Sequence, residues 1–128
     1  MREVTVAVAQ MAPALAKVSE NLKRASEIVD EICRAQKVDL IVFPELVTTG
    51  YECGVQFTDL AERVPGPSVN FLAKQAADYG TCIAFGLVEK QRVESTLYDA
   101  AVLIDPNGEV AAAYRKVHLK GEERLAFR

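Results

Sequence analysis

Residues 38–46 read Val-Asp-Leu-Ile-Val-Phe-Pro-Glu-Leu, an apolar run that ends at a proline and a glutamate. The run 38–43 is short and rich in β-branched residues, which predicts a β-strand. Because its apolar character is nearly continuous, we expect a central strand that is covered on both faces. Glu45 follows at once, at the carboxyl end of this strand.

Strands and helices alternate on both sides of this run. Residues 17–36 carry apolar side chains at steps of three and four, which predicts one amphipathic helix. Pro65-Gly66-Pro67-Ser68 opens a second helix, which Gly80 ends. We predict further strands at 4–9 (buried), 81–88, 96–104 and 110–116, a turn at 105–108, a loop at 48–64 with one helical turn near 58–62, and no element in 120–128.

The resulting order β-α-β-α-β-β-β predicts an α/β fold. Its βαβ units require parallel pairing, and the last two strands form an antiparallel hairpin. The turn of this hairpin is Asp105-Pro106-Asn107-Gly108, in which proline and glycine favour the backbone angles of a tight turn.

Composition excludes several classes of protein. The chain has 128 residues, which corresponds to one domain or a piece of one, and 15 basic against 18 acidic residues give a net charge of −3. This charge argues against a nucleic-acid or membrane partner. No secretory leader or membrane-spanning run is visible, and the cysteines Cys33, Cys53 and Cys82 are odd in number and far apart. We therefore expect a cytoplasmic protein without disulfides or zinc.

Two residues are candidates for chemistry by position. Glu45 lies where ligands gather in open α/β sheets, and an apolar wall there raises the pKa of a carboxyl group that serves as a base. The alternative is an ordinary loop residue. Lys116 ends the fifth strand on the same face as Tyr114 and His118, where a lysine can stabilise an oxyanion. The alternative, favoured for Lys116 alone, is a side chain that extends into solvent.

The other reactive residue types point to structural roles. His118, the only histidine, is expected to be a hydrogen-bonded structural residue, and Glu122 and Glu123 to be part of a solvated charge cluster. Asp99 forms no carboxylate pair with anything nearby in sequence. Cys33 and Cys82 are expected to be buried and inert, and Cys53 to be the only cysteine that reaches solvent. Glycine-rich phosphate loops are absent from the sequence.

Several segments together resemble the nitrilase superfamily of carbon–nitrogen hydrolases. Val42-Phe43-Pro44-Glu45-Leu46 is similar to the strand that delivers the catalytic glutamate of the family, and Tyr114-Arg115-Lys116-Val117-His118-Leu119 to the segment with its catalytic lysine. Supporting likenesses are Val6–Gln10, Asn21-Leu22, Thr49-Gly50-Tyr51 and the hairpin 97–108. The hairpin of the family usually has Asn where this chain has Asp99.

This resemblance implies hydrolysis of an amide, a carbamoyl amide or a nitrile through a thioacyl intermediate, without metal or organic cofactor. Glu45 would be the general base, Lys116 would stabilise the oxyanion, and Glu123 would hold the lysine and the base. Tyr51 and the loop 52–58 would line the entrance for substrate.

The family also implies a cysteine nucleophile beyond the lysine, and nothing here matches it. We therefore expect residues 1–128 to be a partial domain, the N-terminal half of an α-β-β-α sandwich, and inactive alone. An uncovered sheet face would then favour a homo-oligomer or a partner chain. The alternatives are a catalytically inactive remnant that acts as a binding or assembly partner, and a generic Rossmann-like domain, which the absent glycine loop disfavours.

Overall fold

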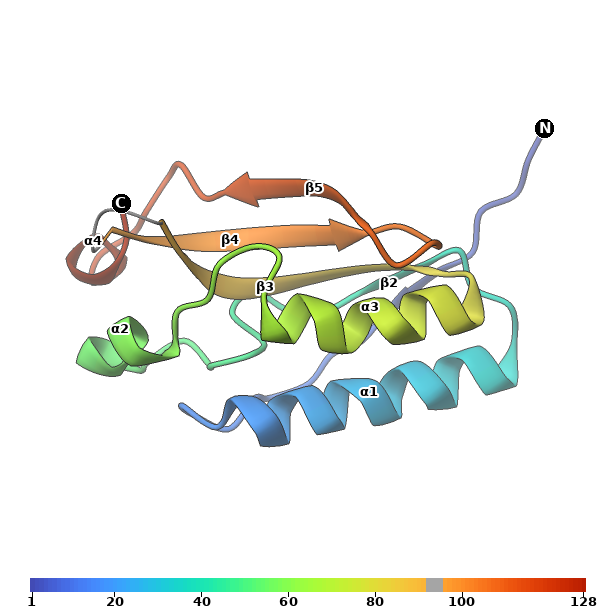
Figure 1. The fold of residues 1–128 in the computed structure, drawn as a ribbon, viewed down its shortest axis with the longest axis horizontal. Helices are drawn as coiled ribbons and strands as arrows, with labels where there is room; N and C mark the ends of the chain where they lie inside the picture. The colour runs from blue at the N-terminus through green and yellow to red at the C-terminus, as the bar shows by residue number, and fades with distance from the viewer. Residues whose placement is uncertain (92–95) are drawn as a thin grey trace.

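One mixed β-sheet organises the molecule (Figure 1). The computed structural model describes residues 1–91 and 96–128. Its strands lie in the order β1-β2-β3-β4-β5, with β1–β3 parallel and β3–β5 antiparallel. The elements are β1 Val6–Val8, α1 Val18–Ala35, β2 Leu40–Val42, a 3-10 turn Gly54–Gln56, α2 Phe57–Leu60, α3 Pro67–Tyr79, β3 Cys82–Lys90, β4 Leu97–Ile104, β5 Val110–Arg115 and α4 Glu123–Ala126. The predicted α/β order is therefore confirmed, with strands that are shorter at several ends.

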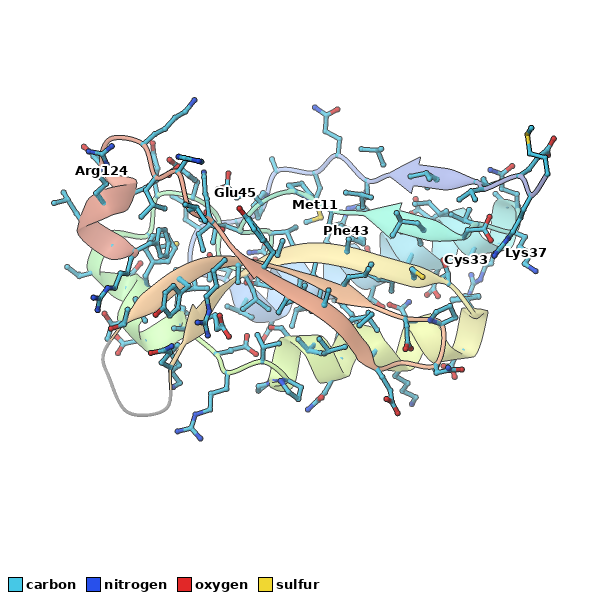
Figure 2. The ribbon with its side chains drawn as sticks, turned by 90° about the horizontal axis from the view of Figure 1, so that it is seen from above. Met11, Cys33, Lys37, Phe43, Glu45 and Arg124 are labelled. Atoms are coloured by element: carbon cyan, nitrogen blue, oxygen red, sulfur yellow. The ribbon has the colours of Figure 1, made fainter. Side chains whose placement is uncertain are left out.

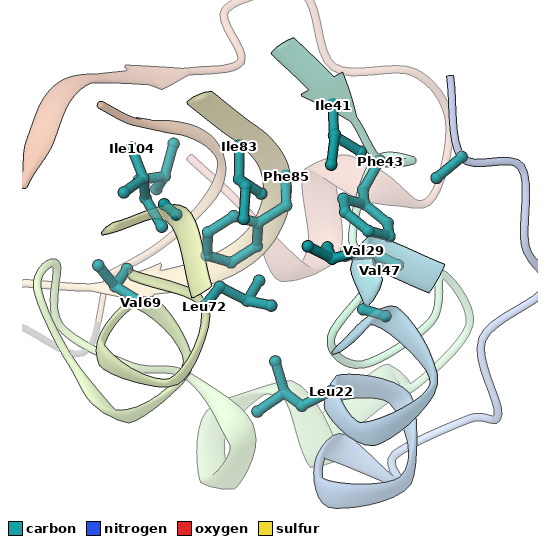
Figure 3. Packing of buried hydrophobic residues seen from close by; sticks show 14 of the residues in the cluster. Leu22, Val29, Ile41, Phe43, Val47, Val69, Leu72, Ile83, Phe85 and Ile104 are labelled. Carbon is teal, nitrogen blue, oxygen red and sulfur yellow. The ribbon is translucent and has the colours of Figure 1, made fainter. Parts of the chain in front are cut away.

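Helices α1 and α3 cover one face of the sheet side by side (Figure 1). Proline occupies the first position of α3, where its missing N–H costs nothing, and Gly80 ends the helix in the left-handed conformation at φ +63°. The side chains between helices and sheet form the main core (Figure 3). Its fully buried members include Val29, Ile41, Leu72, Ile83, Phe85 and Ile104.

The opposite face of the sheet is largely uncovered. Strand alternation places Val6 and Val8, Leu40 and Val42, Ala84, Leu103 and Tyr114 on it. Val6, Val8 and Tyr114 are 51%, 77% and 62% exposed. The predictions of a buried first strand and of a second strand covered on both faces were therefore wrong, because α1 and α3 cover only one face of these two strands.

One end of this second face is covered by the chain itself. Leu46, Cys53, Phe57, Val88, Leu97 and Phe127 form a smaller apolar cluster there. Residues 120–128, expected to hold no element, form α4 because Phe127 packs against Phe57 with ring centroids 4.9 Å apart. The expected helical turn at 58–62 starts earlier, at Phe57, for the same reason.

None of the helices in the described part of the chain combines the length and the apolar composition that crossing a membrane requires.

Candidate active site

Glu45 is placed by a close approach between two backbones. After β2, Phe43 N–H donates to Ala84 O (2.8 Å) and Gly86 N–H donates to Pro44 O (3.3 Å), so the chain crosses β3 at Gly86. A Cβ at Gly86 would lie 2.4 Å from Leu46 N and 2.8 Å from Glu45 Cα. Only glycine leaves room for this crossing, which carries Glu45 onto the uncovered face of the sheet.

Lys116 reaches Glu45 on the same face from the end of β5, the last strand of the sheet. Its N–H donates to Asp99 O (2.8 Å), which continues the β4–β5 ladder by one residue. Its Nζ donates to Glu45 Oε1 at 2.6 Å and to Glu123 Oε1 at 3.0 Å. Figure 2 shows Glu45 next to the segment that connects β5 to α4. The fold thus brings together two residues 71 positions apart in sequence.

Glu123 is the most enclosed of the three, with a side chain that is 5% exposed. Besides Lys116, its carboxylate accepts hydrogen bonds from the Tyr51 hydroxyl and from Lys120 N–H (2.8 Å). Three hydrogen-bond donors therefore meet at this carboxylate. The structure thus places Glu123, which the family resemblance favoured, at the lysine, whereas the neighbouring Glu122 is exposed. The expectation that Glu123 belongs to a solvated charge cluster was wrong.

The charge state of the cluster follows from these contacts. The hydrogen bond from Asp99 and the ammonium of Lys116 lower the pKa of Glu45. Tyr51, a backbone N–H and Lys116 lower the pKa of Glu123 to about 2. The two glutamates raise the pKa of Lys116 in turn. The expected rise in the pKa of Glu45 was wrong, because the hydrogen bonds from Asp99 and Lys116 outweigh the effect of burial. At neutral pH Glu45 and Glu123 are carboxylates and Lys116 is an ammonium.

Sequence reasoning missed Asp99. It is 4% exposed and its carboxyl lies at Glu45, far away in sequence. The strand periodicity that placed Asp99 gave no sign of this partner, because the crossing at Gly86 sets the contact. A hollow of ≈ 290 Å³ on the uncovered face is lined by Glu45, Asp99, Tyr114 and Lys116.

The cysteines differ from expectation. Cys53, expected to reach solvent, is buried in the smaller apolar cluster, where its Sγ donates to Thr49 O (3.1 Å). Cys33 and Cys82, expected to be buried, are half-exposed, because Cys33 lies at the margin of the main core and Cys82 lies on the uncovered face of the sheet. His118 lies beyond β5 and is exposed. No group of three or more His, Cys, Asp or Glu side chains within residues 1–91 and 96–128 is arranged to hold a metal ion.

Comparison with known proteins identifies the family. The family model described as carbon-nitrogen hydrolase matches residues 5–127. The chain belongs to the carbon–nitrogen hydrolase family. Glu45, Lys116 and Glu123 all lie within the matched residues.

Individual relatives agree with this assignment. The chain is 40% identical to a protein named "Probable nitrilase" from Schizosaccharomyces pombe, over 98% of this chain and 47% of that one. It is 30% identical to the 2-oxoglutaramate amidase of Bacillus subtilis, over 90% and 43%. The crystal structure of an N-terminal amidase with an Asn-Glu-Ala peptide superposes with a TM-score of 0.86 at 26% identity, over 97% of this chain and 30% of that chain. The chain therefore spans less than half the length of these relatives.

Proposed function

We propose that residues 1–128 form a partial carbon–nitrogen hydrolase domain that supplies the base and the oxyanion-stabilising cation for hydrolysis of an amide, a carbamoyl amide or a nitrile. The observation that carries this proposal is the position of Lys116 Nζ, within hydrogen-bond distance of both Glu45 (2.6 Å) and Glu123 (3.0 Å). The family model supports it, because all three residues lie in the matched range.

The charge state suits the reaction. Glu45, ionised at neutral pH, accepts the proton of a cysteine thiol, and the thiolate attacks the substrate carbon. Lys116 donates a hydrogen bond to the oxygen or nitrogen that gains negative charge. In an amide the C–N bond then breaks, and the proton on Glu45 passes to the departing nitrogen. Water activated by Glu45 finally hydrolyses the thioester. None of these steps requires a metal or an organic cofactor.

We propose that the thiol comes from outside residues 1–128. Cys53 is buried and donates its S–H to a backbone carbonyl, which supports this assignment. Tyr51 is 49% exposed beside Glu123, which supports a role for Tyr51 and the loop 52–58 at the substrate entrance. The uneven number of cysteines supports a reducing compartment such as the cytoplasm.

The test begins with the intact mass of the protein isolated without proteolysis, together with any chain that stays bound to it. Ammonia release from small amides and nitriles is then measured on that assembly. Glu45→Gln and Lys116→Gln should each lower kcat/KM by about 10²-fold or more. Lys74→Gln and Glu109→Gln change exposed residues outside the site and serve as controls. Full activity in either site variant would contradict the proposal.

A second candidate function is a binding or assembly partner without turnover. It is favoured by the uncovered apolar face of the sheet, on which Val8 and Tyr114 are largely exposed. An assembly of intact mass 14.0 kDa per chain that lacks turnover would support this function over the first.

A further inference from the structure

Asp99 is a buried carboxyl group, and one of its two oxygens lacks a hydrogen-bond partner among the described residues. It lies on β4 opposite Val88 of β3, and it is 4% exposed. Its backbone carbonyl accepts Lys116 N–H, which fixes the residue in the ladder. Its Oδ2 is buried and receives no hydrogen bond from the part of the chain that the structure describes. An ionised carboxylate in this position would be costly.

Three charged groups face Asp99, each from a different element. They are Glu45 from the segment after β2, Lys116 from the end of β5, and Glu123 from α4. From β3 the paired residue is the apolar Val88. Lys116 directs its ammonium to the two glutamates at 2.6 and 3.0 Å. One cation thus serves three carboxyl groups, so full ionisation would leave two uncompensated negative charges.

We propose that Asp99 is a positioning residue that keeps its proton at neutral pH and donates it in a hydrogen bond to the carboxylate of Glu45. Two carboxyl groups in contact form a hydrogen bond only when one of them carries a proton. Asp99 is the more buried of the pair, and Glu45 alone is held by the ammonium. The proton therefore belongs on Asp99. The role in positioning the base rests on the proposed function, whereas the protonation does not.

The direction of both pKa shifts agrees with this arrangement. Burial, followed by the contact with Glu45, raises the pKa of Asp99 to about 8. The same hydrogen bond is the main cause that lowers the pKa of Glu45. Between the lowered pKa of Glu45 and about pH 8 the pair is one acid and one carboxylate. Above pH 8 Asp99 loses its proton, the hydrogen bond is lost, and two carboxylates repel each other beside Lys116.

The decisive experiment is a titration of Asp99 in the 128-residue chain, followed by NMR of ¹³C-labelled aspartate carboxyl groups. We expect one resonance to titrate near pH 8, to vanish in Asp99→Asn, and to move to lower pH in Glu45→Gln. The exposed Asp59→Asn should leave it in place. An Asp99 resonance that titrates near the ordinary value of about 3.9 would overturn the proposal. Asparagine has the same shape and donates to Glu45 from its amide, so the variant preserves the packing.

A second measurement separates this proposal from the proposed function. The NMR titration requires no turnover, so it tests the protonation of Asp99 whether or not the protein has hydrolase activity. In an active assembly, Asp99→Asn should retain more activity at pH 7 than Asp99→Ala and should lack the loss of kcat/KM above pH 8. If kcat/KM of Asp99→Asn still falls above pH 8 as in the unaltered protein, Asp99 does not cause that fall, and the positioning role is overturned.

Discussion

Single residues determine where the candidate base lies, and Gly86 is the clearest example. Gly86→Ala places a methyl group 2.4 Å from Leu46 N, so the crossing segment must move. We expect the free energy of unfolding to fall by about 1–3 kcal/mol, as for other overpacked sites, measured by urea denaturation. Ala101→Val adds volume opposite Gly86 at an exposed position and should change stability far less. Equal losses in the two variants would contradict the close-approach argument.

The hydroxyl of Tyr51 contributes to stability only while Glu123 is ionised. The pKa of Glu123 is lowered to about 2, so its stabilising contribution is present above its ordinary pKa and is lost as the pH falls towards 2. Tyr51→Phe should therefore lower the urea midpoint at pH 6, and the difference should shrink as the pH falls from 5 to 2.5. Tyr98→Phe, on β4 beneath the Arg115 guanidinium and away from Glu123, is the control. A difference in urea midpoint that does not change with pH would contradict the hydrogen bond from Tyr51 to the ionised Glu123.

At the scale of elements, the sequence predicts those features that follow from the local spacing of apolar residues. The stripe Leu22, Ala25 and Val29 of α1 is buried as predicted, and Gly80 ends α3 as predicted. The order of the strands follows from the same rules. The spacing of apolar residues could not show that β1 is an exposed edge strand, because the burial of a strand depends on which elements cover each face of the sheet.

The candidate site likewise combines residues that the sequence predicts with contacts that it does not. Glu45 and Lys116 were identifiable as strand ends, and Glu123 only through the family resemblance. The Asp99–Glu45 contact depends on the crossing at Gly86. Cys53 was misplaced because its burial depends on Phe57 and Phe127, which are brought together only by the tertiary fold. Contacts between segments that no local pattern relates are thus what sequence reasoning misses.

Helix α1 is tied to the segment after Glu45 by Asn21. Its side chain accepts Ala14 N–H (2.8 Å) and donates to Ala14 O (2.8 Å) and Thr48 O (3.0 Å). Asn21→Ala leaves these buried groups unpaired, and we expect a loss of about 1–3 kcal/mol in the free energy of unfolding. Glu20→Ala, exposed in the same turn, should stay within about 0.5 kcal/mol. If both variants unfold at the same urea concentration, Asn21 is not the link.

For the molecule as a whole, the 128-residue chain alone should show no amide or nitrile turnover. It carries a base and a cation, but Cys53 lies in a buried apolar cluster, Cys33 on α1 and Cys82 at the start of β3. Ammonia release at the level of the buffer is the expected result. Should turnover occur, Cys53→Ala decides the matter: lost activity with retained folding would make Cys53 the nucleophile and refute our assignment.

The uncovered sheet face makes a prediction about association. Val8 and Tyr114 are 77% and 62% exposed on the same face, in a row of apolar side chains too extended for a soluble monomer. We expect the chain to sediment as a dimer or larger species at micromolar concentration. Val8→Lys and Tyr114→Lys together should shift it towards monomer, since burying two ammonium groups is unfavourable. Val55→Lys changes a residue that is 91% exposed on the 3-10 turn and should leave the sedimentation unchanged. A monodisperse monomer of the unaltered chain would show that this face is stable in water and would remove the support for an assembly role.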